Sequence, residues 1–303
     1  MMEFTDFQLK ITTLFPQMKI KCNEPMSTHT SFRIGGPAEV MAFPQNTNEL
    51  SDLLKQSQLL DCKIAILGAG TNVLAPDEGL PGLVICLKDC LDGLEQLDDC
   101  RIRVSAGVTM TRAAVFAANL GLGGMEFAHG IPGTVGGGVY MNAGAYGGEI
   151  KDICQSVEVM DPLGNIRILT GEQMQFSYRH SCLEETGEIV VSAVFVLTPK
   201  APELIREYMQ ELAARRKASQ PLDKPSAGSA FKRPAVGYAA ALIDQAGLKG
   251  CRVGDAAVSD KHAGFVVNLG NATAAQVRDL LQYVAVKVKE NSGIDLEPEV
   301  RIW

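Results

Sequence analysis

The 303-residue chain lacks the features that would direct it into a membrane or out of the cell. Its start, Met-Met-Glu-Phe-Thr-Asp, has neither the basic region nor the apolar region of a secretory signal. It contains no run of about 20 apolar residues that could span a bilayer. The segment 127–148 carries no Asp, Glu, Lys or Arg, but its many glycines, Pro132 and Asn142 make it a poor membrane helix. We therefore expect a cytoplasmic protein without membrane insertion.

Recognisable metal and disulfide patterns are also missing. The eight cysteines form no C-x-x-C pair and no Cys/His zinc spacing, and only Cys86 and Cys90, four residues apart, resemble half of a metal site. Scattered thiols of this kind are typical of a reducing compartment. The sequence predicts reduced cysteines, no structural disulfide and no metal.

Clustered positive charge is absent as well. The chain has 28 Lys and Arg against 35 Asp and Glu, a formal net charge of −7. This balance argues against a nucleic-acid-binding protein but allows a local basic pocket for one anionic small molecule. With 46% hydrophobic and 21% charged residues, the chain can bury a core, and its length allows one large or two ordinary domains.

Apolar periodicity predicts helices and strands in no regular order. The predicted helices are 48–60, 109–120, 203–217, 238–246 and 274–290. The predicted strands are 63–67, 83–87, 101–105, 156–160, 166–169, 188–197, 264–269 and 299–303. This mixture favours an α+β fold over a doubly wound parallel sheet. The polar stretch 218–234 is expected to be irregular, and Pro199 and Pro202 place a domain boundary near residue 200.

Glycines are the abundant residue, 30 in all, and they concentrate in two segments. In 67–73 a predicted strand enters a Gly-Ala-Gly turn, but Val73 stands where a Rossmann fingerprint needs its last glycine, and no Walker A lysine follows. The second segment, 130–148, could offer backbone N–H groups to a pyrophosphate. A plain loop is the alternative explanation for the first segment, and close packing of turns is the alternative for the second.

The order of the motifs resembles the UDP-N-acetylenolpyruvoylglucosamine reductase family from about residue 27 to the end of the chain. The matching motifs are Thr28-His-Thr-Ser-Phe-Arg-Ile-Gly-Gly36, Gly68-Ala-Gly-Thr-Asn72, Gly130-Ile-Pro-Gly-Thr-Val-Gly-Gly137, Asn142-Ala-Gly-Ala-Tyr-Gly147, Ser177-Tyr-Arg179, Gly228-Ser-Ala-Phe231 and Leu296-Glu-Pro-Glu-Val-Arg301. Between Arg179 and Glu203 the chain is short, so it resembles the form of the family without an extra tyrosine-bearing segment.

The resemblance implies an α+β flavoprotein of the vanillyl-alcohol-oxidase type. It implies a FAD-binding region at 1–199, made of two subdomains split near 75–80, and a C-terminal α+β substrate-binding domain at 200–303. It also implies that FAD is held noncovalently, although His29 and His129 could be considered for covalent attachment. The implied FAD-binding residues are Gly68, Ala69, Gly70, Thr71, Asn72, Val73, Pro132, Gly133, Thr134, Gly136, Gly137, Asn142, Ala143, Gly144, Tyr146 and Gly147.

The implied reaction is the NADPH-dependent reduction of UDP-N-acetylglucosamine enolpyruvate to UDP-N-acetylmuramate, for peptidoglycan precursors. Hydride from flavin N5 to the enolpyruvyl group leaves negative charge beside a carboxylate, which must be stabilised and then protonated. By resemblance, Arg179 binds that carboxylate, Ser229 donates the proton and Glu299 assists. Taken alone, each has an ordinary explanation: a surface arginine, a turn serine, and an ion-pair partner of Arg301.

Substrate contacts follow from charge and from the same resemblance. The UDP diphosphate needs cations, and basic residues gather around the 218–234 stretch. The candidate substrate-binding residues are Tyr178, Arg215, Gln220 and Arg233. A helix C-terminus is the alternative explanation for Arg215. Arg233 stands where the family can place an asparagine, which leaves its role open.

Two other functions remain possible from the sequence. A related flavoprotein oxidase would act on an alcohol or a sugar, but the joint presence of Arg179, Ser229 and Glu299 argues against it. A nucleotide-binding module without catalysis would more naturally lack one of the three.

Overall fold

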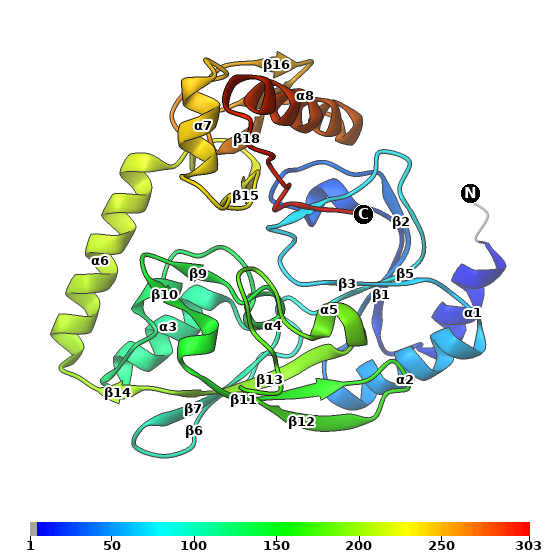
Figure 1. The fold of residues 1–303 in the computed structure, drawn as a ribbon. Coiled ribbons are helices and arrows are strands. Elements are labelled where there is room, and N and C mark those ends of the chain that lie inside the picture. Colours follow the sequence, from blue (N-terminus) through cyan, green and yellow to red (C-terminus); the bar gives the residue numbers. More distant parts are fainter. Residues whose placement is uncertain (1–4) are drawn as a thin grey trace. The chain divides into compact units, whose positions relative to one another are not determined.

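The computed structural model describes residues 5–303, and the chain divides into two compact units (Figure 1). Unit 1 is formed by the described residues up to Cys22, by Glu39–Ala69 and by Pro81–Arg215, and unit 2 by Asn23–Ala38, Gly70–Leu80 and Arg216–Trp303. Each unit therefore combines three separate stretches of sequence. The linear boundary between residues 199 and 200 stays a prediction.

Unit 1 holds most of the strands and the longer part of the chain. The elements that lie wholly or mainly in it are α1 (Asp6–Leu14), β1 (Lys19–Pro25), β2 (Pro37–Phe43), α2 (Thr47–Leu59), β3 (Ile64–Leu67), β5 (Leu80–Cys86), β6 (Leu94–Gln96), β7 (Arg101–Ser105), α3 (Met110–Asn119), β8 (Leu122–Gly123), α4 (Val135–Tyr140), β9 (Gly144–Ala145), β10 (Gly148–Glu149), β11 (Cys154–Met160), β12 (Ile166–Thr170), α5 (Leu183–Thr186), β13 (Ile189–Val196), β14 (Thr198–Pro199) and α6 (Pro202–Ser219).

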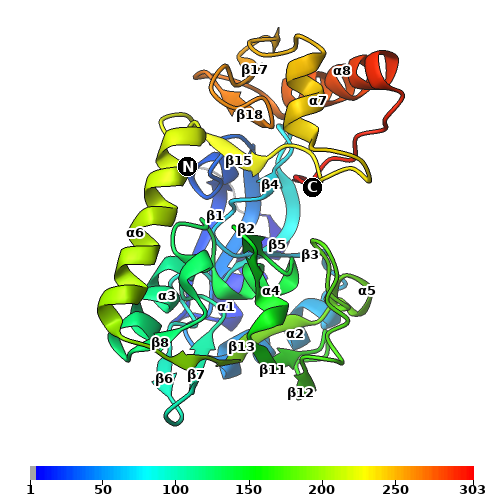
Figure 2. The same cartoon turned by 60° about the vertical axis from the view of Figure 1, so that its left-hand side comes forward.

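Two sheets organise unit 1. One has the strand order β1-β2-β5-β3, and the other is antiparallel with the order β12-β11-β13-β7-β6. Strand β13 is apolar almost throughout because both of its faces are covered. Ala193 and Phe195 pack in a core with α3 and α4, whereas Ile189 and Val191 pack in a second core with α2. Figure 2 shows α3 and α4 together on one side of this sheet.

Unit 2 is a smaller α+β unit. Its elements are β4 (Val73–Leu74), β15 (Ser226–Ser229), α7 (Ala239–Gln245), β16 (Arg252–Val253), β17 (Ala256–Val258), β18 (Phe265–Asn268), α8 (Ala274–Ser292) and β19 (Arg301–Ile302). Its antiparallel sheet has the order β15-β18-β17-β16, and α7 and α8 contribute to the core that covers it. The carboxylate of Asp77 accepts the N–H groups of Ala274 and Ala275, so a residue from far upstream caps α8.

The α+β class predicted from the sequence is confirmed, and most predicted elements are present. Strand β7 has the predicted bounds, and α3 begins after its predicted start, where the Thr109 hydroxyl accepts the Arg112 N–H. Three expectations were wrong or incomplete. The stretch 218–234 contains strand β15, and the terminal strand is only two residues long. The glycine-rich residues 135–140, for which no helix was predicted, form α4.

The eight cysteines are free thiols, and burial raises the pKa of the Cys154 thiol to about 12. Within residues 5–303, no helix combines the length and the apolar character needed to cross a membrane.

An ion pair links the edge strand β12 to the start of β13, which lies on the other side of β11 in the sheet. The Arg167 guanidinium donates from Nε to Glu188 Oε1 at 2.6 Å and from Nη2 to Oε2 at 2.7 Å. The Glu188 side chain is buried, and its hydrogen bonds to Arg167 lower the pKa of its carboxyl group below the ordinary value. A carboxyl pKa that is lower in the folded than in the unfolded chain stabilises the fold at every pH at which that carboxyl group is ionised in the unfolded chain.

We expect Glu188→Gln to lower the free energy of unfolding at pH 7 by about 1–2 kcal/mol, since it removes a charge-assisted pair that is half exposed on the arginine side. The difference from wild type should persist above the unfolded glutamate pKa of about 4.3 and vanish as the pH falls through the lowered folded value. Denaturant unfolding at several pH values measures this. Glu95→Gln, which breaks the exposed pair with Arg103, is the control and should change stability by less than about 0.5 kcal/mol. Equal effects of the two substitutions at pH 7 would contradict the prediction.

Candidate active site

The two glycine-rich segments meet in unit 1. A Cβ added at Gly68 would lie 2.6 Å from Thr134 Oγ1, so only glycine allows the 67–70 turn to approach the 130–137 segment this closely. Thr134 is the N-cap of α4, and its hydroxyl accepts the Gly137 N–H. Two segments that are more than 60 residues apart in the sequence therefore form one local structure.

The glycines of α4 differ in how closely other residues pack against them. A Cβ at Gly136 would lie 2.9 Å from the Ala106 Cβ, and one at Gly138 would lie 2.7 Å from the Met110 sulfur. These two glycines therefore permit close packing, the alternative weighed from the sequence. At Gly137 an added Cβ would meet only Thr134 Oγ1, at 3.7 Å, which is an ordinary contact. Packing within unit 1 does not require glycine at position 137.

The 142–147 loop holds the segment that carries Arg179. Asn142 is fully buried in a left-handed conformation, and its Nδ2 donates to Glu149 Oε2 at 2.7 Å and to Ser177 O at 2.8 Å. Arg179 also has a positive φ of 55°, and its Nη2 donates to Gly144 O at 3.3 Å. Its guanidinium lies 4.9 Å from the centre of the Tyr178 ring. Since the amide of Asn142 is engaged by the protein, its role in the structure is to join this loop to the segment of Arg179.

In unit 2, the turn after Gly70 pairs with the end of the chain. Asn72 O accepts the Arg301 N–H at 2.9 Å, and Asn72 Nδ2 donates to Glu299 O at 3.1 Å. Val73 pairs with Arg301 in the parallel bridge of β4 and β19. Glycine is required at position 70 because φ is +62° and an added Cβ would lie 2.1 Å from His29 O. A predicted FAD-binding residue and a predicted catalytic residue, Asn72 and Glu299, are thus directly hydrogen-bonded.

Ser229 lies at the end of β15, on a segment that also pairs with the end of the chain. Ala230 O accepts the Glu299 N–H at 2.9 Å, and Phe231 bridges to Pro298. On its other edge the segment pairs with β18, where Ser229 lies opposite Phe265. The register shifts between Ser226 and Ser229 at Gly228, whose φ is +77°. The structure therefore brings Ser229 and Glu299 together on adjacent backbone segments, whereas Arg179 belongs to unit 1.

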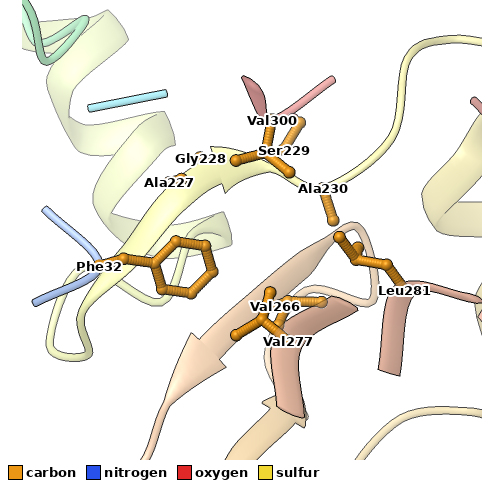
Figure 3. A pocket seen from close by; sticks show the side chains of 9 residues that line it. All are labelled: Phe32, Ala227, Gly228, Ser229, Ala230, Val266, Val277, Leu281 and Val300. Carbon is orange, nitrogen blue, oxygen red and sulfur yellow. The ribbon is translucent and has the colours of Figure 1, made fainter. Parts of the chain in front are cut away.

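One side of Ser229 is apolar. The serine contributes the one polar side chain among the nine residues that line a small pocket in unit 2. Figure 3 shows Val300 beside Ser229, with Phe32, Val266 and Val277 beneath β15. The lining on this side of β15 is therefore apolar apart from Ser229, which as a residue is exposed.

His262 supports the strand opposite Ser229. Burial lowers the pKa of its imidazole, so the ring is neutral near pH 7. Its Nδ1 accepts the Gly264 N–H at 3.1 Å, and Gly264 O accepts the Ala230 N–H at 2.8 Å. The histidine thus shapes the turn that holds the residue after Ser229.

The candidate substrate-binding residues are spread over both units. Arg215 is exposed and paired with Glu211 at 2.5 Å, and Arg233 is exposed with its guanidinium 4.3 Å from the Tyr238 ring centre. The Gln220 N–H donates to Arg216 O, which continues the end of α6. Arg216, one of the basic residues that gather around the 218–234 stretch, is buried, with 7% of its surface exposed. Because consecutive residues of a helix point in different directions, Arg215 and Arg216 of α6 face different surroundings.

Observations in unit 1 fit a bound FAD. Glycine at 137 leaves space that no protein side chain requires, and a Cβ at Gly147 would meet nothing within 4 Å. The buried Nδ1 of His129, next to the 130–137 segment, has no hydrogen-bond partner among residues 5–303. Open glycine positions and an unused buried polar atom are what a ligand in contact with the backbone would need.

Comparisons with known proteins agree with this geometry. Residues 220–303 match the family model described as the C-terminal domain of UDP-N-acetylenolpyruvoylglucosamine reductase, and residues 38–170 match that of an FAD binding domain. A UDP-N-acetylenolpyruvoylglucosamine reductase of Caldanaerobacter subterraneus is 45% identical over 97% of this chain and 96% of its own length. The chain belongs to the UDP-N-acetylenolpyruvoylglucosamine reductase family. One from Agathobacter rectalis is also 45% identical, with 98% of each chain covered.

Solved structures give the same result for this family member. The crystal structure of UDP-N-acetylenolpyruvylglucosamine reductase from Thermus caldophilus matches with a TM-score of 0.82 and 36% identity, covering 94% of this chain and 99% of that one. An alkyldihydroxyacetonephosphate synthase, 16% identical with a TM-score of 0.50 over 65% of this chain, shares the fold alone. The predicted flavoprotein fold is thus confirmed. The chain is an FAD-dependent oxidoreductase, while the roles of individual site residues stay predictions.

We expect Gly137→Ala to weaken FAD binding without destabilising the apoprotein. The new methyl group fits within unit 1 and improves helix propensity by about 1 kcal/mol, but it occupies space that we assign to the cofactor. Thermal unfolding of the apoprotein and fluorescence titration with FAD measure the two effects. Gly136→Ala is the matched control, since its methyl group collides with Ala106 and should destabilise the apoprotein itself. Wild-type FAD affinity in Gly137→Ala would show that this glycine lies away from the cofactor.

Proposed function

We propose that this chain reduces UDP-N-acetylglucosamine enolpyruvate to UDP-N-acetylmuramate with electrons from NADPH, in peptidoglycan precursor synthesis. The observation that carries the proposal is the link from Ser229 through the backbone of Ala230 to Glu299 and on to Asn72. It supports a proton donor and a carboxylate held beside the turn that we assign to FAD. Membership of the family supports the choice of substrate.

The chemistry that FAD would supply when bound is acceptance of a hydride from NADPH and its delivery to the enolpyruvyl group. Within unit 1, Gly68 and Gly137 would hold it, and the family resemblance also assigns to it the residues Gly70–Asn72. Hydride addition leaves enolate character on the carbon next to the substrate carboxylate, and this carbon must then receive a proton.

We assign stabilisation of that charge to Arg179. Its guanidinium offers a planar fork of donors that suits a carboxylate. The hydrogen bond to Gly144 O and the stacking on Tyr178 orient the group, so less side-chain entropy is lost when the substrate binds.

We assign the proton donor to Ser229 Oγ. A serine hydroxyl is a weak acid, so it can protonate only a strongly basic carbon, and an enolate next to a carboxylate meets this condition. Glu299, on the paired segment, is assigned to assist this transfer near the substrate carboxylate. Arg215, Gln220 and Arg233 are proposed to contribute to binding of the UDP portion.

Ser229→Ala should separate the two halves of the reaction. Under anaerobic conditions NADPH should bleach the visible flavin absorbance at nearly the wild-type rate. The return of that absorbance on addition of UDP-N-acetylglucosamine enolpyruvate should slow by about 10²–10⁴-fold, the usual contribution of a general acid.

Ser226→Ala, on the same strand, is the matched control and should keep both rates. Near-normal reoxidation in Ser229→Ala would refute the assignment of the proton donor. Failure of the wild-type reduced protein to reoxidise with this substrate would refute the proposed substrate itself and leave an oxidase as the better hypothesis.

A further inference from the structure

Ser31 connects two parts of unit 2 that the proposed function uses together. Its backbone N–H donates to Gly70 O at 3.0 Å, on the turn assigned to FAD. Its hydroxyl donates to Ser226 O at 2.6 Å, on the strand that ends in Ser229. Residue 31 lies in the 28–36 motif, which carried part of the family resemblance but received no role. The side chain is half-buried, and its hydroxyl lies closest to Ser226 O, with Gly70 O as a second acceptor at 3.4 Å.

Strand β15 needs such a contact because it is an edge strand. It pairs only with β18 in its sheet, and its register is broken by the bulge at Gly228. Pro225 O accepts the Asn268 N–H from the β18 side, so the next carbonyl along the strand, Ser226 O, points to the opposite edge. The Ser31 hydroxyl satisfies that carbonyl and fixes the strand from its open side.

Phe32 secures the same contact from below. Its carbonyl accepts a hydrogen bond from Asn268 Nδ2 at 3.0 Å, and its ring lines the pocket beside Ser229 (Figure 3). Only 2% of Phe32 is exposed, so the backbone at residue 32 is anchored and the neighbouring Ser31 hydroxyl is presented at a fixed position.

We infer that Ser31 is a positioning residue for proton transfer: through Ser226 O it holds β15 so that Ser229 Oγ stays aligned, relative to the Gly70 turn, with the carbon that it protonates. The inference rests on the proposed function. Small errors in the alignment of a reacting group are costly, because the gain from a preorganised site depends on near-attack geometry. A hydroxyl that acts through the backbone of β15 can therefore control one half of the reaction.

The test compares Ser31→Ala with Ser31→Thr in the FAD-loaded protein. Ser31→Ala should slow the substrate-dependent return of flavin absorbance by about tenfold, the rate equivalent of one ordinary hydrogen bond. Bleaching by NADPH should change by less than about twofold, because that half needs no proton from Ser229. Ser31→Thr keeps a hydroxyl and should restore the reoxidation rate.

A second readout does not depend on activity. Amide hydrogen exchange in the peptide that covers residues 225–231 should accelerate in Ser31→Ala, since β15 loses its hold on the open edge, and should return to the wild-type rate in Ser31→Thr. Thr28→Ala is the matched control from the same motif. The Thr28 hydroxyl donates to Pro25 O at 2.8 Å rather than to β15. Neither half-reaction, nor amide hydrogen exchange in residues 225–231, should therefore change.

Several results would overturn the inference. Equal slowing of both half-reactions, or loss of FAD affinity with wild-type reoxidation, would make Ser31 a general stabiliser of the turn.

If Ser31→Ala does not fold, Ser31→Cys keeps the volume with a weaker donor. Full-rate reoxidation in that variant would overturn the inference, and a slowed rate would support it. Wild-type protein that fails to reoxidise with the enolpyruvyl substrate would refute the proposed function, whereas normal wild-type turnover with an unaffected Ser31→Ala would refute the role of Ser31 alone.

Discussion

The pairing of the Asn72–Leu74 segment with the last five residues is the constraint on which unit 2 depends. It joins groups 227 positions apart along the chain, through Asn72 Nδ2 and Glu299 O, and continues in the hydrogen bond from Trp303 N–H to Leu74 O. Closing so long a loop is entropically unfavourable, although the cost grows only slowly with length. The buried side chains of Leu74 and Val300, which lie in the same core, offset it. Without this pairing, Glu299 and the segment of Ser229 would lose their link to the Gly70–Asn72 turn.

Glycine shapes the two units for different reasons at different positions. Gly68 and Gly136 are needed because a Cβ would collide with Thr134 or with Ala106, and Gly70 is needed because its backbone is left-handed and lies against His29 O. Gly137 has no such requirement within the protein. The packing explanation is therefore confirmed for Gly68 and Gly136, whereas a ligand contact at Gly137 stays a prediction. The distinction appears only when the neighbour of every missing Cβ is known.

The sequence predicts helices and strands well where local signals are strong, and it misses strands that form only because a distant segment pairs with them. Strand β7 alternates apolar and polar residues, and α3 starts at a threonine cap, so both were found. Strand β15 reads Ser-Ala-Gly-Ser, which has no apolar alternation; it becomes a strand because β18 pairs with it and Ser31 holds its other edge. Family motifs indicated Ser229 and Glu299, but no local pattern could show that Ala230 O binds the Glu299 N–H. The link through Ser31 was equally invisible, because a serine 195 positions from its partner carries no spacing signal.

A serine that protonates carbon must be held more rigidly than an acid of lower pKa. Proton transfer from a stronger acid is more favourable, so it tolerates imperfect alignment of donor and acceptor. Transfer from a weakly acidic hydroxyl depends more strongly on how the hydroxyl is placed. An edge strand with a bulge is a flexible place to put such a group. The fold compensates by bonding the backbone around Ser229 on three sides: Gly264 O from the β18 side, the Glu299 N–H from the end of the chain, and the Ser31 hydroxyl at Ser226 O. The bulge at Gly228 bends the strand next to Ser229, and these hydrogen bonds hold the backbone on either side of the bulge.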